Sequence, residues 1–361
     1  MDYLKSRVIS DLSWSLRVAS AIVLSLVASA APRITALVDI RIGKPTFFNK
    51  QEGWAVSGPS VLRTVDGGST WRRVKIIIGG KEAAGEIRGT YFVSAKTAWI
   101  TLAEGDGLRD RLGLSPGFVS THDGGATWRA ESLPTADWFF DSLFSADDPK
   151  GSVWLGGQVS HESVASVEDM ECPQRVTGFL WSPAIYFRPT PASAWEEQRL
   201  PVQNGCPVSM IRFLDKSRGV AIIGSDIVFS QDGGKHWQRS TIRSSTKFLP
   251  AVSMQFRGHA GWIGAHGEIL HTVDAGEHWE EIVAVRTIWS KELGFGPWGT
   301  VHFISEATGF TLGGDGELFE TMNGGKTWTK VALPERIVSL SCAEDVCWLA
   351  SNEKLYRLEA E

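Results

Sequence analysis

The chain has 361 residues, a formal net charge of −5 and a sequence pI near 6.0. This balance, with no run of basic residues, argues against a nucleic-acid-binding protein, which would carry a basic patch or stripe. Its 38 Gly, 17 Phe and 16 Trp indicate β structure, and so many Trp indicate a residue that is used periodically.

The N-terminus predicts export. Three basic residues precede an uncharged stretch, residues 18–31, which contains a small-x-small cleavage pattern and is too short for a membrane span. We therefore expect residues 1–30 to form a signal peptide or an uncleaved anchor. Residues 31–361 then form a periplasmic or secreted domain, held at the membrane if the leader is not cleaved.

An eight-residue pattern, Thr/Ser-x-Asp/Asn-Gly/Ala-Gly-x-Thr/His-Trp, recurs along the rest of the chain. This Asp box occupies residues 64–71, 121–128, 230–237, 272–279 and 321–328. A worn sixth copy ends at Trp195, without the Asp or the glycines. Five copies of one pattern indicate a repeat architecture.

A second landmark, a small residue followed by an aromatic or apolar one, opens a short β-like run before each box. It occurs at Gly53-Trp54, Ala98-Trp99, Val153-Trp154, Gly219-Val220, Gly261-Trp262, Gly309-Phe310 and Cys347-Trp348. Each unit contains four short strands and recurs every 42 to 50 residues or so, about the period of a propeller blade. There are thus seven landmarks and six boxes.

The two ends of the chain explain this mismatch. The last unit begins at Ile337 and has three strands and no box, whereas residues 34–42 form a lone strand before the first unit. We expect this N-terminal strand to complete the last blade, which removes exposed sheet edges. The predicted fold is an all-β, seven-bladed β-propeller with Asp-box repeats, closed by its N-terminal strand.

The box residues are expected to build the turn between the third and fourth strands. They are Asp66, Trp71, Asp123, Trp128, Asp232, Trp237, Asp274, Trp279, Asn323 and Trp328. The glycines supply positive φ, the Asp accepts backbone N–H bonds and the Trp anchors the turn. Reading the Asp residues as catalytic acids or calcium ligands is less favoured, because one carboxylate per blade cannot converge on one substrate.

Four cysteines in an exported chain favour disulfides. Cys342 and Cys347 flank a four-residue turn, residues 343–346, and we expect them to bridge a hairpin. Cys172 and Cys206, each beside a Pro, form the second expected pair. Three pairings are possible in principle, and four free thiols remain the alternative.

Three connections are longer than the repeat requires: around residues 104–115, around residues 157–177, and residues 286–299. All three are predicted on the face opposite the boxes, where loops on a rigid scaffold commonly carry function. The candidate binding residues are Arg109, Arg111, Trp289, Phe295 and Trp298, of types enriched at interfaces. The alternative is that the two Trp plug the channel mouth and the Arg residues are solvated.

Signals of an enzyme are few. The sequence has no nucleophile elbow, P-loop or zinc-binding helix motif, and its eight His show no close metal-ligand pairing. We expect no metal and no cofactor. The acidic residues of the enlarged loops could include a carboxylate pair for glycoside chemistry, although a charged surface loop is the commoner explanation.

The combined unit, landmark G-W-A-V followed by V-L-R-T-x-D-G-G-x-T-W, resembles the propellers related to the photosystem II assembly and stability factor of cyanobacteria and plastids. The resemblance covers residues 34–358, although the family's basic binding surface has no residue-by-residue match. It implies a seven-bladed scaffold that binds a membrane-protein assembly intermediate, although a photosynthetic partner does not follow. We expect a monomeric, non-enzymatic protein that binds a protein partner, such as a membrane or envelope complex, and no nucleic acid. Asp boxes also occur in sialidases, so a glycoside hydrolase is the alternative, and residues 187–189 weakly resemble a sialidase motif.

Overall fold

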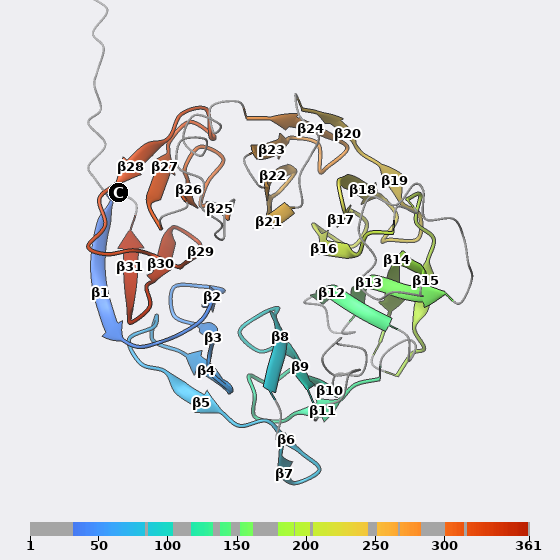
Figure 1. The fold of residues 1–361 in the computed structure, drawn as a ribbon, viewed down its shortest axis with the longest axis horizontal. Coiled ribbons are helices and arrows are strands. Elements are labelled where there is room, and N and C mark those ends of the chain that lie inside the picture. The colour runs from blue at the N-terminus through green and yellow to red at the C-terminus, as the bar shows by residue number, and fades with distance from the viewer. Residues whose placement is uncertain are drawn as a thin grey trace, which may run out of the picture.

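The structure is a computed structural model, and its seven sheets stand as blades around one axis (Figure 1). It describes residues 32–83, 86–103, 117–132, 138–145, 152–161, 180–190, 192–202, 205–244, 251–265, 268–282, 300–313 and 316–359. The predicted seven-bladed propeller is confirmed. Within these residues no helix is both long and apolar enough to cross a membrane.

Each blade is built on four antiparallel strands, and in blades 1 to 6 these strands follow one another in chain order from the ring axis outward. Blades 1 to 3 comprise β2 (Thr46–Phe47), β3 (Gly53–Ser57), β4 (Ser60–Thr64) and β5 (Arg72–Val74); β8 (Glu86–Phe92), β9 (Ala98–Ala103), β10 (Gly117–Thr121) and β11 (Arg129–Ala130); and β12 (Trp138–Ser145), β13 (Val153–His161), β14 (Leu180–Arg188) and β15 (Glu196–Gln198). Blades 4 to 6 comprise β16 (Val208–Phe213), β17 (Gly219–Ile223), β18 (Asp226–Ser230) and β19 (Gln238–Arg239); β21 (Ala251–Arg257), β22 (Ala260–Ala265), β23 (Glu268–Thr272) and β24 (His278–Glu281); and β25 (Val301–Phe303), β26 (Gly309–Leu312), β27 (Leu318–Thr321) and β28 (Thr329–Val331). The landmark therefore lies at the start of the second strand, and the box between the third and fourth.

Blade 7 combines the two ends of the chain. It consists of β29 (Ser339–Ala343), β30 (Val346–Ala350), β31 (Lys354–Glu359) and the N-terminal strand β1 (Arg33–Asp39). β1 pairs antiparallel with β31, from Arg33 opposite Glu359 to Asp39 opposite Lys354. Figure 1 shows it as the outermost strand of the blade. The expected closure is confirmed: the N-terminal strand β1 pairs with β31, so β31 has no unpaired edge.

Three features of the strands depart from the repeat. The hairpin formed by β6 (Ile77–Ile78) and β7 (Lys81–Glu82) lies outside the ring between blades 1 and 2 (Figure 1). β20 (Thr241–Arg243) adds a fifth strand to blade 5, parallel to β24. β13 continues to His161, so the expected long loop from residue 157 begins later: its first residues extend the hairpin with β14.

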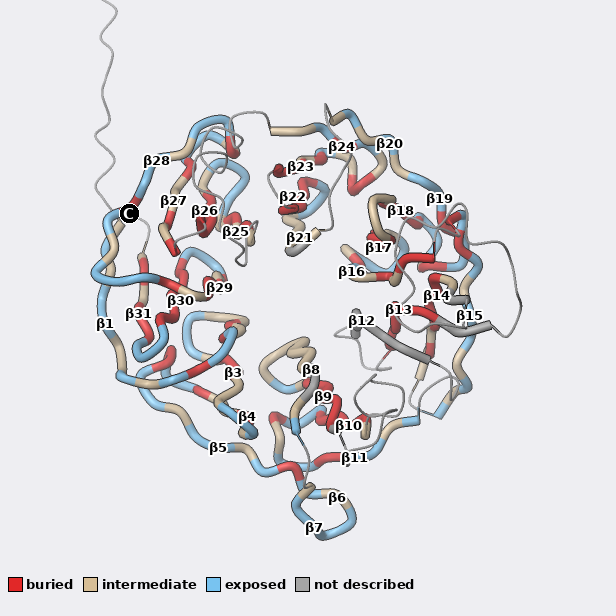
Figure 2. The backbone as a smooth tube through the Cα atoms, viewed as in Figure 1, coloured by how far each residue is buried: buried red, intermediate tan, exposed pale blue. Residues whose placement is uncertain are grey.

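Aromatic rings join neighbouring blades and explain the periodic Trp. The landmark Trp of one blade stacks on a Phe in the first strand of the next, with centroid separations of 3.7 Å for Trp348 and Phe47 and 4.1 Å for Trp262 and Phe303. The box Trp packs edge-on against the same Phe, at 5.9 Å for Trp71 and 6.1 Å for Trp328. Buried residues accordingly concentrate in the middle strands (Figure 2), as in β17 and β22, which are buried throughout.

The small residue of the landmark makes room for that Phe. A Cβ on Gly261 would lie 2.3 Å from the ring of Phe256, its cross-strand partner, so no larger residue fits without a shift. In blade 7 the same cross-strand pair is Cys342 and Cys347, which form a disulfide. The turn between them is shorter than expected, because residues 343 and 346 also pair and leave two residues at the tip.

Candidate functional site

The box of blade 1 shows what its polar side chains do. The Thr64 hydroxyl donates to the Asp66 carboxylate at 2.8 Å and accepts from the Gly68 N–H at 2.9 Å. The N–H and hydroxyl of Thr70 donate to the same carboxylate at 2.9 and 2.6 Å. The Gly67 N–H donates to the Gln51 carbonyl at 2.8 Å, which ties this turn to the loop between the first two strands. The carboxylate is thus held by its own turn.

The other four complete boxes repeat these contacts. His236 and His278 replace the second Thr and contact their box carboxylates through Nδ1, at 2.5 and 2.7 Å. In blade 6 an Asn takes the place of the Asp, and the Thr327 N–H donates to Asn323 Oδ1 at 2.9 Å. Ala275 stands where other boxes have their first Gly and adopts a φ of 62°. An uncharged side chain can therefore build the turn, which supports a structural role for the box.

The bonds within the boxes also lower the pKa of their carboxyls. For Asp66 the largest cause is the hydrogen bond from the Thr70 side chain, followed by the bond from its backbone. Burial raises the pKa of Asp123, but bonds from Thr127 and Thr121 outweigh it and lower the pKa to about 2. Such carboxylates stay ionised at neutral pH and accept bonds from their own turn, so they are unsuited to act as general acids.

The worn box of blade 3 is replaced by contacts with blade 2. Arg188 stands at the register position that Thr64 holds in blade 1, opposite the first landmark residue. Its guanidinium pairs with Glu131 at 2.9 Å, both side chains being almost fully buried, and lies 4.5 Å from the centroid of the Trp195 ring. The Trp195 indole N–H donates to the Ser132 carbonyl at 3.0 Å. This turn is anchored to the neighbouring blade.

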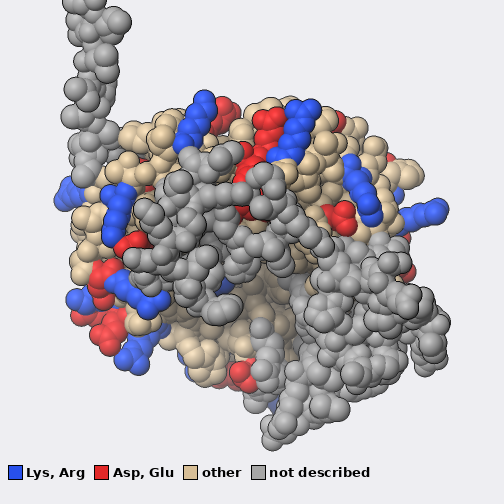
Figure 3. Space-filling model, turned by 45° about the horizontal axis from the view of Figure 1, so that its top comes forward, with Lys and Arg blue, Asp and Glu red and all other residues tan. Residues whose placement is uncertain are grey.

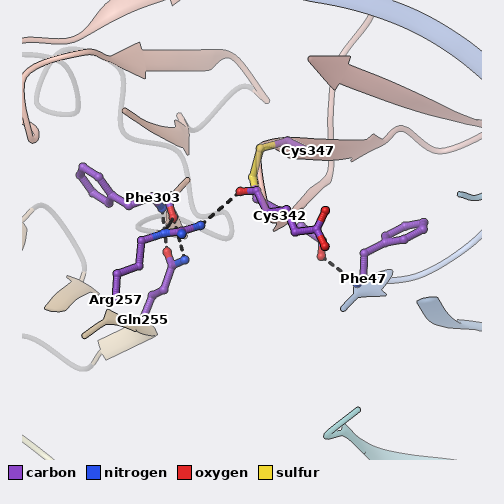
Figure 4. Close-up of a disulfide and its surroundings, with 8 residues drawn as sticks. Phe47, Gln255, Arg257, Phe303, Cys342 and Cys347 are labelled. Carbon is purple, nitrogen blue, oxygen red and sulfur yellow. Dashed lines mark hydrogen bonds between the residues drawn. A yellow bond between two sulfur atoms is a disulfide. The ribbon is translucent and has the colours of Figure 1, made fainter. Parts of the chain in front are cut away.

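The first strands of neighbouring blades are joined by a line of polar contacts, the inner seam, seen best between blades 5 and 6 (Figure 4). Ser253 accepts from the Val301 N–H at 3.0 Å, and Gln255 exchanges two bonds with the backbone of Phe303, at 2.7 and 2.8 Å. Arg257 donates to the Phe303 carbonyl at 2.6 Å and to the carbonyl of residue 344, in blade 7, at 3.2 Å. These side chains satisfy backbone groups that an innermost strand leaves unpaired.

The landmark and Asp-box patterns do not mark this seam. A sequence position does mark it: in each first strand, one seam residue directly precedes the last aromatic residue or cysteine. Among the described side chains these residues are Thr46, Tyr91, Arg212, Gln255, His302 and Ser341. None of these is acidic. Burial lowers the pKa of His302 to about 4, despite its bond to the backbone of Leu340, so this imidazole is neutral at pH 7.

The five candidate binding residues, Arg109, Arg111, Trp289, Phe295 and Trp298, lie outside the described residues. The described strand ends place their connections: β9 ends at Ala103 and β10 resumes at Gly117, while β24 ends at Glu281 and β25 begins at Val301. All these ends are on the edge of the ring opposite the boxes. On the described surface in Figure 3, Lys and Arg are interspersed with Asp and Glu.

Three of the four cysteines lie within the described residues. Cys342 and Cys347 are joined, with Cα atoms 4.0 Å apart. Cys206 is buried and disulfide-bonded, whereas Cys172 lies outside the described residues, so their pairing stays a prediction. Within the described ranges no group of three or more His, Cys, Asp or Glu side chains is arranged to hold a metal ion.

Comparisons with known proteins agree with this architecture. The family model for the photosynthesis system II assembly factor YCF48 matches residues 188–288. The chain is 30% identical over 156 residues to the chloroplast photosystem II stability/assembly factor HCF136 of Arabidopsis thaliana, and 29% identical over 122 residues to the photosystem II assembly lipoprotein Ycf48 of Synechococcus sp. strain CC9902. These alignments cover 40% and 33% of this chain, and 36% and 34% of the relatives. The chain therefore matches about a third of the length of each curated relative.

Solved structures extend the likeness to the whole ring. A structure described as YCF48 bound to D1 peptide has a TM-score of 0.57 at 17% identity, covering 92% of this chain and 96% of that one. YCF48 from Cyanidioschyzon merolae has the same TM-score at 16% identity, covering 91% and 99%. A GH74 xyloglucanase from Xanthomonas campestris reaches 0.55 at 11% identity, covering 90% of this chain and 53% of the enzyme. At these identities the structural likeness shows the fold alone.

Proposed function

We propose that this photosystem II assembly factor-like propeller is a non-enzymatic, exported scaffold that holds a protein partner on the face opposite its Asp boxes, and that it assists the assembly or stability of a membrane or envelope complex. The observation that carries the proposal is the asymmetry of the ring. On the box face, short turns are fixed by their own hydrogen bonds, whereas the three enlarged connections leave from the other face. The relative described as bound to D1 peptide supports a polypeptide as the ligand class.

We assign the contact to the two connections that carry Arg109, Arg111, Trp289, Phe295 and Trp298. Trp, Phe and Arg offer large contact areas and directed hydrogen bonds, and such residues supply most of the energy of protein interfaces. A rigid ring can present them without a large ordering cost. The partner is expected to be a segment of a membrane or envelope protein that is exposed during assembly.

The test is quantitative capture of the tagged, exported protein from membranes of its own host. A variant with Arg109→Ala, Arg111→Ala, Trp289→Ala and Trp298→Ala is expected to capture at least about tenfold less of a specific membrane-protein partner than the parent. These substitutions remove the side chains that anchor the interface. The matched control carries Val65→Ala and Met322→Ala, which alter exposed apolar residues in the box turns of blades 1 and 6. Equal capture by both variants would show that the partner does not bind the enlarged connections.

The glycoside hydrolase alternative has no support from the described inner seam, in which none of the residues named above is Asp or Glu. A glycosidase needs two carboxyl groups roughly 5 to 10 Å apart across its substrate. We expect no release of reducing sugar from xyloglucan or sialylated glycans. Hydrolysis by the purified protein that disappears when one loop carboxylate is changed to its amide would contradict the scaffold proposal.

A further inference from the structure

A cleft of about 480 Å³ lies between blades 5 and 6 on the box face. Blade 5 contributes His271, Val273 and Glu280, and blade 6 contributes Glu306, Gly324 and Lys326. The cleft is on the opposite side of the ring from the proposed partner site, and the inference below does not depend on that site.

At two other blade interfaces an arginine side chain fills the equivalent space. In blade 1 the cross-strand partner of the landmark Trp54 is Arg63, whose guanidinium lies 5.7 Å from the Trp54 ring centroid and 2.9 Å from a Glu52 carboxylate oxygen. It reaches the first box glycine of blade 2: a Cβ on Gly124 would lie 2.9 Å from Arg63 Nη1. A guanidinium thus fills the interface between an aromatic ring, a carboxylate and a box glycine.

The interface between blades 7 and 1 repeats the arrangement. Arg357 is the cross-strand partner of the landmark Trp348, and its guanidinium pairs with Glu359 at 3.0 Å. A Cβ on the next box glycine, Gly67, would lie 3.6 Å from Arg357 Nη1. The same position therefore supplies an arginine at two interfaces of this chain.

At the interface between blades 5 and 6 this position holds the shorter His271. Its imidazole lies against the landmark Trp262, with ring centroids 5.2 Å apart. A Cβ on the next box glycine, Gly324, would meet only the Glu306 carbonyl oxygen, at 3.2 Å, and no side chain within 4 Å. The aromatic ring and the box glycine are both present, and the space that a guanidinium occupies at the other two interfaces remains open as the cleft.

The charges beside the cleft favour a cation. Burial is the main influence on His271 and lowers its pKa, although Glu280 and Glu306 oppose this, so the imidazole is neutral at pH 7 while both carboxylates act on it. The described residues give Glu306 no ion pair, and they pair Glu280 with Arg243 at 3.5 Å between two largely exposed side chains, a contact worth little. Lys326 also lines the cleft, but no ion pair among the described residues joins it to these carboxylates.

We propose that this cleft binds an arginine side chain of a partner protein, in the place that Arg63 and Arg357 occupy at the equivalent interfaces. A planar guanidinium can stack on the His271 face while its donors reach Glu280 and Glu306, a geometry that a lysine ammonium matches less well. Val273, 70% exposed at the edge of the cleft, offers an apolar contact to a neighbouring residue of the same segment. The partner is therefore a segment in which an exposed arginine adjoins an apolar residue.

The test uses the folded chain and N-acetyl-arginine amide as the probe, followed by NMR of the ¹⁵N-labelled Trp indoles, with the Trp262 signal assigned from a Trp262→Phe variant. The expected result is saturable, millimolar binding that shifts the Trp262 signal. N-acetyl-citrulline amide, which has the same shape and no charge, is expected not to bind. Binding of both probes alike, or of neither, would overturn the proposal.

Two substitutions then exchange the residues that stand at the equivalent position of the two interfaces. His271→Arg places a guanidinium in the cleft from within the chain and is expected to weaken probe binding at least about tenfold. Arg63→His should open the equivalent space between blades 1 and 2 and create a second site beside Trp54. Glu280→Gln with Glu306→Gln is expected to abolish binding at the first site, and thermal unfolding checks that each variant is folded. Unchanged binding in His271→Arg would place the probe elsewhere and contradict the proposal.

Discussion

Blades 1 and 3 end their third strands in opposite ways. Thr64 of blade 1 closes a turn whose Thr and Asp side chains bond within the blade, whereas Arg188, at the same register position of blade 3, pairs with Glu131 of blade 2. Both arrangements anchor the turn before the fourth strand. The box is thus one of at least two local solutions to the same structural problem, and this interchangeability supports a structural role for its polar residues.

The largest change in stability is expected from a substitution in blade 3 that removes the ion pair standing in place of the box. Arg188→Met leaves the Glu131 carboxylate, 4% exposed, without its buried partner, and should lower the free energy of unfolding by about 3 kcal/mol. This is the low end for such a loss, because Arg129 still contacts Glu131 at 2.6 Å. Urea unfolding measures the change. The double variant Arg188→Met with Glu131→Gln should recover part of the loss, and a single variant as stable as the parent would show that the pair does not replace the box.

Blade 7 extends the comparison to the aromatic core. Its Cys342–Cys347 disulfide stands where other blades place a Phe over a Gly. Replacing both with Ser should cost about 2 kcal/mol, the value for closing so short a loop. Cys342→Phe with Cys347→Gly should be more stable than the double Ser variant, because it restores the pair found in blades 1, 4, 5 and 6. If the two variants unfold at the same urea concentration, the disulfide has not taken the place of that pair.

A single complete box gives a smaller effect. Asp66→Ala removes the acceptor of the Thr70 bonds and should cost about 1 to 2 kcal/mol in urea unfolding. Asp66→Asn should cost less than half as much, since Asn323 builds the same turn in blade 6. Equal losses in the two variants would mean that the charge, and not the acceptor geometry, holds the turn.

The smallest effect is expected on the loss of stability at acid pH. The boxes lower the pKa of Asp123 and Asp232 from 3.8 to about 2, so each carboxylate stabilises the fold above the unfolded pKa and loses this contribution as the pH falls toward 2. A variant with all four box Asp changed to Asn should show a shallower fall in unfolding free energy between pH 5 and pH 2 than the parent. Curves of equal slope would place the acid sensitivity in other groups.

The repeat made the fold predictable, and the departures from it were not. Seven landmarks, six boxes and a lone first strand are enough to derive the blade number and the closure, because each blade reuses the same local bonds. The sequence does not show that Arg188 replaces a box, since its partner Glu131 lies in another blade. The partners of the inner seam were not predictable for the same reason: Gln255 and Arg257 bind backbone groups of other blades, and the position of a residue in its own strand does not identify those groups.

The central claim is that the membrane or envelope partner whose assembly is assisted binds the face opposite the boxes. The most direct measurement places a photoreactive amino acid at position 289, on an enlarged connection, or at Met322, which is 49% exposed in a box turn, and crosslinks the exported protein in its host. The account predicts a membrane- or envelope-protein adduct from position 289 and none of that size from position 322. The same adduct from position 322 alone would place the partner on the box face and contradict the account.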